Sequence, residues 1–110
     1  MKLDLQLKEQ VREILSVIRQ IAPGKSVELR IPPYAAIQCV TGVTHRRGTP
    51  PNVVEMNAET LIELIDNPNQ WADLCNQGFI SASGANSDIS SFLAHASKIL
   101  LNSDRNLHGY

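Results

Sequence analysis

The sequence predicts an α+β fold, in which a small, mainly antiparallel or mixed sheet of about four to five strands is covered by helices. Apolar residues recur at helical spacing near both ends of the chain, and they alternate with polar residues between positions 27 and 31. Short apolar runs in the middle of the chain are bounded by proline, glycine and asparagine, which is typical of strands and turns. At 110 residues we expect a single domain, 1–110, with a polar tail from about residue 103.

The N-terminal region is expected to form one amphipathic helix of about 16 to 19 residues. Asp4 is a candidate N-cap, and Pro23 with Gly24 should end the helix. The apolar stripe is wide enough to cover one face of a sheet, and the alternative is a dimer helix. The stripe consists of Leu7, Val11, Ile14, Leu15, Ile18, Ile21 and Ala22.

The segments predicted as strands are 26–32, 36–44, 52–56 and 79–83. In the first segment, Val27, Leu29 and Ile31 alternate with charged residues, which indicates a half-buried strand. Pro32 and Pro33 end it, because consecutive prolines cannot sit in a central ladder. The second segment is apolar enough for a central strand, and it should pair antiparallel with the first around the Pro-Pro-Tyr turn.

Helices separate the third and fourth strands and follow the fourth. Asn57 is the expected N-cap of a helix over 58–66, and Pro68 suits the first turn of a short helix that ends near Gly78. A last helix follows a cap at Asn86, Ser87 or Asp88, with Ile89, Phe92, Leu93, Ala96, Ile99 and Leu100 on its apolar side. The segment from Ser103 to Tyr110 is polar and is expected to fray.

The stretch 45–55 holds more residues with unusual backbone properties than any other part of the chain. Its two consecutive prolines favour an extended backbone, and the glycine before them permits a turn, so it should form a rigid crossing between two strands. One interpretation is a preorganised site for an anion or a polar headgroup. The other is a turn whose charges are solvated or paired, with Arg47 and Glu55 as an ion pair.

Composition excludes several classes of function. A net charge of -1 without a basic stripe argues against nucleic-acid binding, and 5% aromatic residues are too few for base stacking. His45, His95 and His108 share no ligand spacing, so we expect neither a metal nor another cofactor. No apolar leader or run of about 20 apolar residues is seen, so we expect a cytoplasmic protein without integral membrane association.

The two cysteines are expected to be free, packed thiols. Cys39 and Cys75 lie in separate apolar contexts, and neither has a neighbouring base that would lower the pKa of its thiol. With no nucleophile and no acid–base pair, the sequence indicates a protein that is not an enzyme.

Several segments resemble the sterol carrier protein type two superfamily, and most closely its small bacterial sterol-carrier-like members. The residues that carry this resemblance are Pro32-Pro33-Tyr34-Ala35, Gln38-Cys39-Val40, the string from Arg47 to Glu55, and Gln77 to Gly84. It covers roughly residues 8 to 100. The resemblance implies a sterol-carrier-like fold and a non-catalytic carrier of a lipid, an acyl chain or another apolar molecule. Related domains are fused to thiol-dependent isomerase-type enzymes, which implies an alternative function. In that alternative the chain is an accessory or protein-interaction domain with no ligand of its own, and one form of the alternative is a homodimer.

The candidate site follows from the 45–55 stretch and from the family resemblance. We expect an apolar pocket walled by aromatic and aliphatic side chains and by the 36–44 strand, with a cation near its mouth. The expected ligand-binding residues are Arg47, His45, Trp71, Leu74, Phe79 and Phe92. The expected structural motif that frames them is Gly48, Pro50, Pro51, Asn52 and Glu55. Trp71 suits the partly solvated edge of a cavity, because its indole N–H needs a hydrogen-bond partner. The alternative is that Trp71 only fills a gap between helices.

Overall fold

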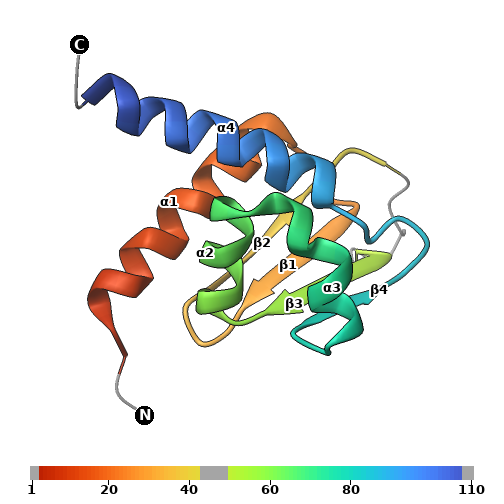
Figure 1. Cartoon of the computed structure of the whole chain (residues 1–110). Helices are drawn as coiled ribbons and strands as arrows, with labels where there is room; N and C mark the ends of the chain where they lie inside the picture. Colours follow the sequence, from red (N-terminus) through yellow and green to blue (C-terminus); the bar gives the residue numbers. More distant parts are fainter. Residues whose placement is uncertain (1–2, 43–49, 108–110) are drawn as a thin grey trace.

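The computed structural model describes residues 3–42 and 50–107, with only the backbone described for 103–107. Its elements follow the predicted order. They are α1 (Leu5–Ile21), β1 (Val27–Ile31), β2 (Ala35–Cys39), β3 (Asn52–Met56), α2 (Ala58–Asp66), the 3-10 turn η1 (Pro68–Gln70), α3 (Trp71–Asn76), β4 (Ile80–Ser83) and α4 (Ser90–Leu107). The helices lie on one side of the sheet, as predicted, with α1 and α4 packed against each other (Figure 1).

In the described part of the chain the sheet is mixed and has the order β2-β1-β3-β4. β1 pairs antiparallel with β2 around the Pro-Pro-Tyr turn, with Leu29 opposite Ile37, which confirms the predicted hairpin. On its other side β1 runs parallel to β3, with Leu29 opposite Val54. β4 pairs antiparallel with β3. The inner strands of the sheet are therefore β1 and β3, and β2 is an edge strand, although its sequence suggested a central one.

The inner face of the sheet is apolar and the outer face is polar. On β1, Val27, Leu29 and Ile31 have no exposed surface, whereas Glu28 and Arg30 point outward. One cluster of buried apolar side chains lies between the sheet and the helices. This cluster is the hydrophobic core of the domain.

The second strand is shorter than the predicted 36–44 segment, because it ends at Cys39. Val40 has a φ of 68°, which takes the backbone out of the extended conformation. Its N–H donates to the carbonyl of Ala22, and its carbonyl accepts from the N–H of Ser26. These bonds tie Val40 to the turn that follows α1, so tertiary contacts override the β-propensity of the sequence. The end of the predicted segment, 43–44, lies outside the described residues.

The predicted helix boundaries are confirmed by their caps. The side chain of Asp4 accepts from the N–H of Leu7, and that of Asn57 accepts from the N–H of Thr60. After α3, the N–H of Gly78 donates to the Cys75 carbonyl, and the next N–H donates to the Leu74 carbonyl. This pair of bonds is the Schellman arrangement that glycine favours.

The last helix agrees with the sequence-based expectation at its start, where Asp88 was one of the expected caps, and differs from it at its end. α4 begins at Ser90, whose N–H donates to the side chain of Asp88. Its backbone stays helical to Leu107, so the helix continues into the segment that was expected to fray. Ser97, on the buried side of α4, donates through its hydroxyl to the Ile65 carbonyl at the end of α2. This bond joins α4 to the rest of the helix layer.

Candidate functional site: a groove at the end of the sheet

A surface groove of about 460 Å³ lies where β2 ends and α4 begins. We call it the Phe92 groove. It is lined by Ser26, Val40, Thr41, Gly42, Ala85, Asn86, Asp88 and Phe92. The volume falls within the range of small-molecule sites, about 300–1,000 Å³. The groove thus brings together Phe92 and the end of the predicted 36–44 segment, two parts of the candidate site named from the sequence.

The side-chain amide of Asn52 fixes the frame of this groove. Asn52 is 2% exposed, and its Nδ2 donates to the Ser26 carbonyl at 2.9 Å and lies 3.2 Å from the Ser26 hydroxyl. Its Oδ1 accepts from the Asn86 N–H at 2.9 Å. One side chain at the start of β3 therefore holds both the residue before β1 and the loop before α4. Since Ser26 and Asn86 line the groove, this amide sets the distance between two of its walls.

Gly84 makes room for the amide. Its φ is +111°, which L side chains rarely adopt, and a Cβ there would lie 2.2 Å from Oδ1 of Asn52 and 2.7 Å from the Pro51 carbonyl oxygen. The loop and the start of β3 are therefore in close backbone contact. Pro50, Pro51 and Asn52, which the sequence analysis grouped as a structural motif, belong to this contact region or lead into it.

The backbone of Val40 is strained, and it lies in the groove wall. A positive φ is a true outlier for a β-branched residue. Such conformations cost about 1–3 kcal/mol and persist only where the surrounding structure over-determines them, often at functional sites. Here two backbone hydrogen bonds, to Ala22 and from Ser26, hold the conformation.

The charge of the described groove lining is negative. Asp88 is the one ionisable side chain among the described lining residues. The pKa of the nearby Cys75 thiol is raised, first by burial and second by the charge of Asp88. His45 and Arg47, the cations expected near the mouth, follow Gly42 in the sequence but lie outside the described residues, as does Gly48.

The remaining predicted pocket residues occupy other places. Trp71 and Leu74 are buried in the helix layer, at 9% and 5% exposure, and Phe79 is 52% exposed before β4. None of the three lines the Phe92 groove. Four lining residues were not predicted as site residues: Ser26, Ala85, Asn86 and Asp88. In the sequence Asn86 and Asp88 carry only a helix-cap signal, and Ser26 and Ala85 carry none.

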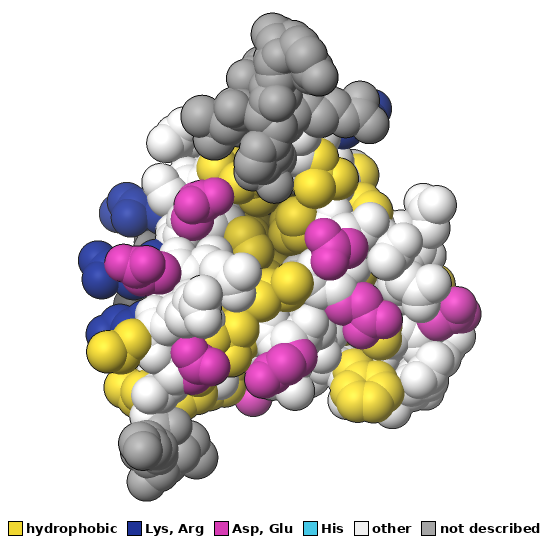
Figure 2. Space-filling model, turned by 60° about the vertical axis from the view of Figure 1, so that its left-hand side comes forward, with side chains coloured by type: hydrophobic (Ala, Val, Ile, Leu, Met, Phe, Trp, Pro, Cys, Tyr) yellow, Lys and Arg dark blue, Asp and Glu magenta, His cyan; other side chains and the backbone are white. Residues whose placement is uncertain are grey.

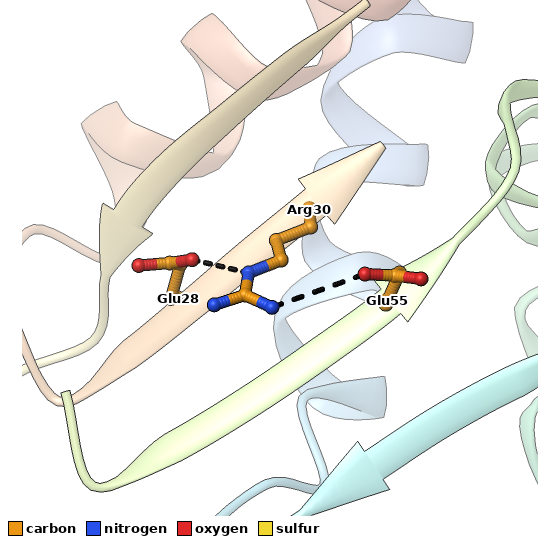
Figure 3. Close-up of polar contacts among 3 residues, drawn as sticks. All are labelled: Glu28, Arg30 and Glu55. Atoms are coloured by element: carbon orange, nitrogen blue, oxygen red, sulfur yellow. Dashed lines mark hydrogen bonds and ion pairs between the residues drawn. The ribbon is translucent and has the colours of Figure 1, made fainter. Parts of the chain in front are cut away.

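Glu55 takes part in an ion cluster on the outer face of the sheet (Figure 3). Arg30 donates through Nε to Glu28, and its guanidinium nitrogen lies 4.0 Å from the Glu55 carboxylate. The hydrogen bond to Glu28 and the charge of Glu28 raise the pKa of Arg30. Both Arg30 and Glu55 are 48% exposed, so solvent screens the pair. The expected Arg47–Glu55 pair stays a prediction, because Arg47 lies outside the described residues.

Metal-ligand clusters, reactive thiols and membrane-spanning helices were also looked for among the described residues. Among the side chains described there, no group of three histidine, cysteine, aspartate or glutamate residues could hold a metal ion. Burial raises the pKa of the Cys39 thiol to about 11, so little thiolate forms near neutral pH. No helix in the described ranges is long and apolar enough to cross a membrane.

These features define the class of protein. Helices packed on one face of an open mixed sheet form an α+β fold of the sterol carrier protein type two kind. The chain belongs to the family described as the bacterial SCP ortholog, whose model matches residues 5–94. This confirms the resemblance seen in the sequence.

A solved structure shows the same fold. It is titled "UbiJ-SCP2 Ubiquinone synthesis protein", and it is similar with a TM-score of 0.52 and 13% sequence identity, over 92% of this chain and 97% of that chain. At this identity the likeness supports the fold alone. A comparison with curated proteins found no match.

The Asn52 amide should contribute a large part of the stability. Asn52→Ala would leave the Asn86 N–H and the Ser26 carbonyl without their partner, at a cost of about 3 kcal/mol or more in free energy of unfolding. Asn69→Ala is the control, since Asn69 is exposed and should change the stability by less than about 0.5 kcal/mol. Urea unfolding measures both. Equal effects of the two substitutions would contradict a structural role for the amide.

Two glycines with positive φ provide a matched pair of alanine variants. Gly78→Ala meets no atom within 4 Å and should cost only the conformational penalty, about 1 kcal/mol. Gly84→Ala adds the collision with Asn52 and Pro51, so it should lower the melting temperature clearly more. Scanning calorimetry of the two variants tests the close contact. A milder effect at Gly84 would show that the loop can move away.

The two thiols should react at different rates in the folded protein. Cys39 has no exposed surface and a thiol pKa of about 11, whereas Cys75 is partly exposed. Iodoacetamide should therefore modify Cys75 first, as followed by mass spectrometry of the intact protein. Asp88→Asn should speed that first step, because it removes the charge that helps to raise the pKa of Cys75. Equal rates for both thiols would be inconsistent with a buried Cys39.

Proposed function

We propose that this protein is a non-catalytic binding domain for a lipid, an acyl chain or another apolar or amphiphilic small molecule. The observation that carries the proposal is the Phe92 groove, which has the volume of a ligand site and a rigid frame. Membership of the bacterial SCP ortholog family supports it. The proposal places the ligand in this surface groove, beside the cluster of buried side chains between the sheet and the helices.

The lining suits a ligand with one apolar and one polar part. Phe92, Val40 and Ala85 offer apolar surface, and the hydroxyl of Thr41 and the amide of Asn86 lie along the same groove. In the proposal the apolar part contacts Phe92, and the polar headgroup meets polar side chains and the cations His45 and Arg47. Burial of such a chain against an aromatic ring would supply most of the affinity.

The absence of catalysis is part of the proposal. The Cys39 thiol, with its pKa of about 11, is poorly suited to nucleophilic attack, and Cys75 also has a raised pKa. Both cysteines are free, which fits the reducing environment of the cytoplasm and supports the location that the sequence suggested.

A second function, a protein-interaction domain, is favoured by a different face of the molecule. Figure 2 shows apolar side chains in a band across the helix side, bordered by Asp and Glu side chains. Leu5 and Leu101 are 71% and 42% exposed, on α1 and α4 respectively. Exposed apolar surface with a polar rim is common at protein interfaces, including those of homodimers.

Binding of a fluorescent fatty-acid probe tests the first function. The wild-type protein should give a saturable rise in probe fluorescence, and Phe92→Ala should weaken binding about tenfold or more, since the ring provides apolar contact. Phe79→Ala is the matched control, because Phe79 is exposed and does not line the groove. The intrinsic fluorescence of Trp71 is a less direct readout, since Trp71 lies outside the groove.

Two further measurements separate the candidate functions. Circular dichroism of both phenylalanine variants verifies that they are folded, and native mass spectrometry of detergent-free protein detects any co-purified lipid. Absence of saturable binding for fatty-acid and sterol probes up to their solubility limits would contradict the carrier function. Dimers in the same mass spectra would then support the interaction domain.

A further inference from the structure

The second strand has a free edge. In the sheet of the described residues, β2 pairs with β1 on one side only. Every second residue of an edge strand directs its N–H and C=O groups away from the sheet, where another chain can pair with them. Natural edges are often protected by charged residues or proline within the strand. The sequence of β2, Ala-Ala-Ile-Gln-Cys, has neither.

A groove with two arginines runs beside this edge. It has a volume of about 490 Å³ and lies between β2 and α1, away from the Phe92 groove. Ala35 and Ile37 contribute from β2, and Arg12, Ser16 and Arg19 contribute from α1. Both arginines are exposed, and neither forms an ion pair with another described residue. Figure 2 shows Lys and Arg side chains along the left margin of the molecule, with acidic side chains beside them.

We propose that an extended acidic peptide segment of another protein binds here as an additional strand on β2. Backbone hydrogen bonds to the free edge would give affinity, and the two arginines would select carboxylates. The arginines are two helical turns apart, about 10 Å along α1. Residues on one face of a strand repeat about every 7 Å, so two carboxylates two or four positions apart are within reach of both arginines.

Charge selects the acidic peptide over a second copy of this chain. If two copies joined their β2 edges, Arg12 and Arg19 of both copies would be brought close to the shared seam, and like charges there are unfavourable. The chain also offers no acidic residue on β2 that could neutralise them. A partner strand with carboxylates on one face can pair with the free edge of β2 and can also neutralise Arg12 and Arg19.

Fluorescence anisotropy with a labelled heptapeptide of alternating glutamate and valine tests the inference. We expect saturable binding that weakens at high salt, and no binding of the peptide with lysine in place of glutamate. The double variant Arg12→Glu with Arg19→Glu should bind at least tenfold more weakly. The double variant Lys25→Glu with Lys98→Glu is the control, since it makes the same change in net charge at other exposed positions.

A second peptide tests the strand pairing without altering the protein. The same heptapeptide, N-methylated at alternate residues, keeps its charges but loses hydrogen-bond donors, so it should bind at least tenfold more weakly. Equal binding of the methylated peptide, or equal loss in the control variant, would overturn the proposal in favour of non-specific attraction. Self-association through β2 that excludes the peptide, or binding of anionic lipid vesicles but not of the peptide, would also overturn it.

Discussion

The buried amide of Asn52 is the interaction on which the arrangement of this fold depends most directly. Its hydrogen bonds connect the start of β3 to Ser26 before β1 and to Asn86 before α4. A buried amide is costly unless all its groups are bonded, and here both the donor and the acceptor have partners. The Phe92 groove owes its shape to this residue, because the amide holds two of its walls together.

Local features of the structure could be predicted from the sequence. Asp4 and Asn57 cap their helices as expected, because a capping side chain acts on an N–H only three residues away. The alternation on β1 and the double proline after it also depend on nearby residues. The family resemblance rested on strings such as Pro-Pro-Asn-Val-Val-Glu, and the match to the bacterial SCP ortholog family confirms it.

Features that depend on residues far apart in the chain could not be predicted. Val40 looks like a strand residue, and only its bonds to Ala22 and Ser26 place it at a positive φ. Asn86 meets Asn52 across 34 positions, which no spacing rule reveals. Phe92 was named as a candidate for its size and apolar character, but its neighbours in the groove follow from the strand order. Trp71 illustrates the limit, since a large aromatic residue can equally fill a helix layer.

The position of β1 between β2 and β3 has a consequence for synthesis on the ribosome. The hairpin of β1 and β2 can form as soon as it leaves the exit tunnel, because its strands are joined by a short turn. The other side of β1 has to wait until residues 52–56 emerge, and the apolar Val27 and Leu29 stay without their parallel neighbours in the meantime. Nascent chains are most prone to aggregate while such strand edges are unpaired. The nascent chain should therefore keep this aggregation-prone edge until β3 has left the ribosome.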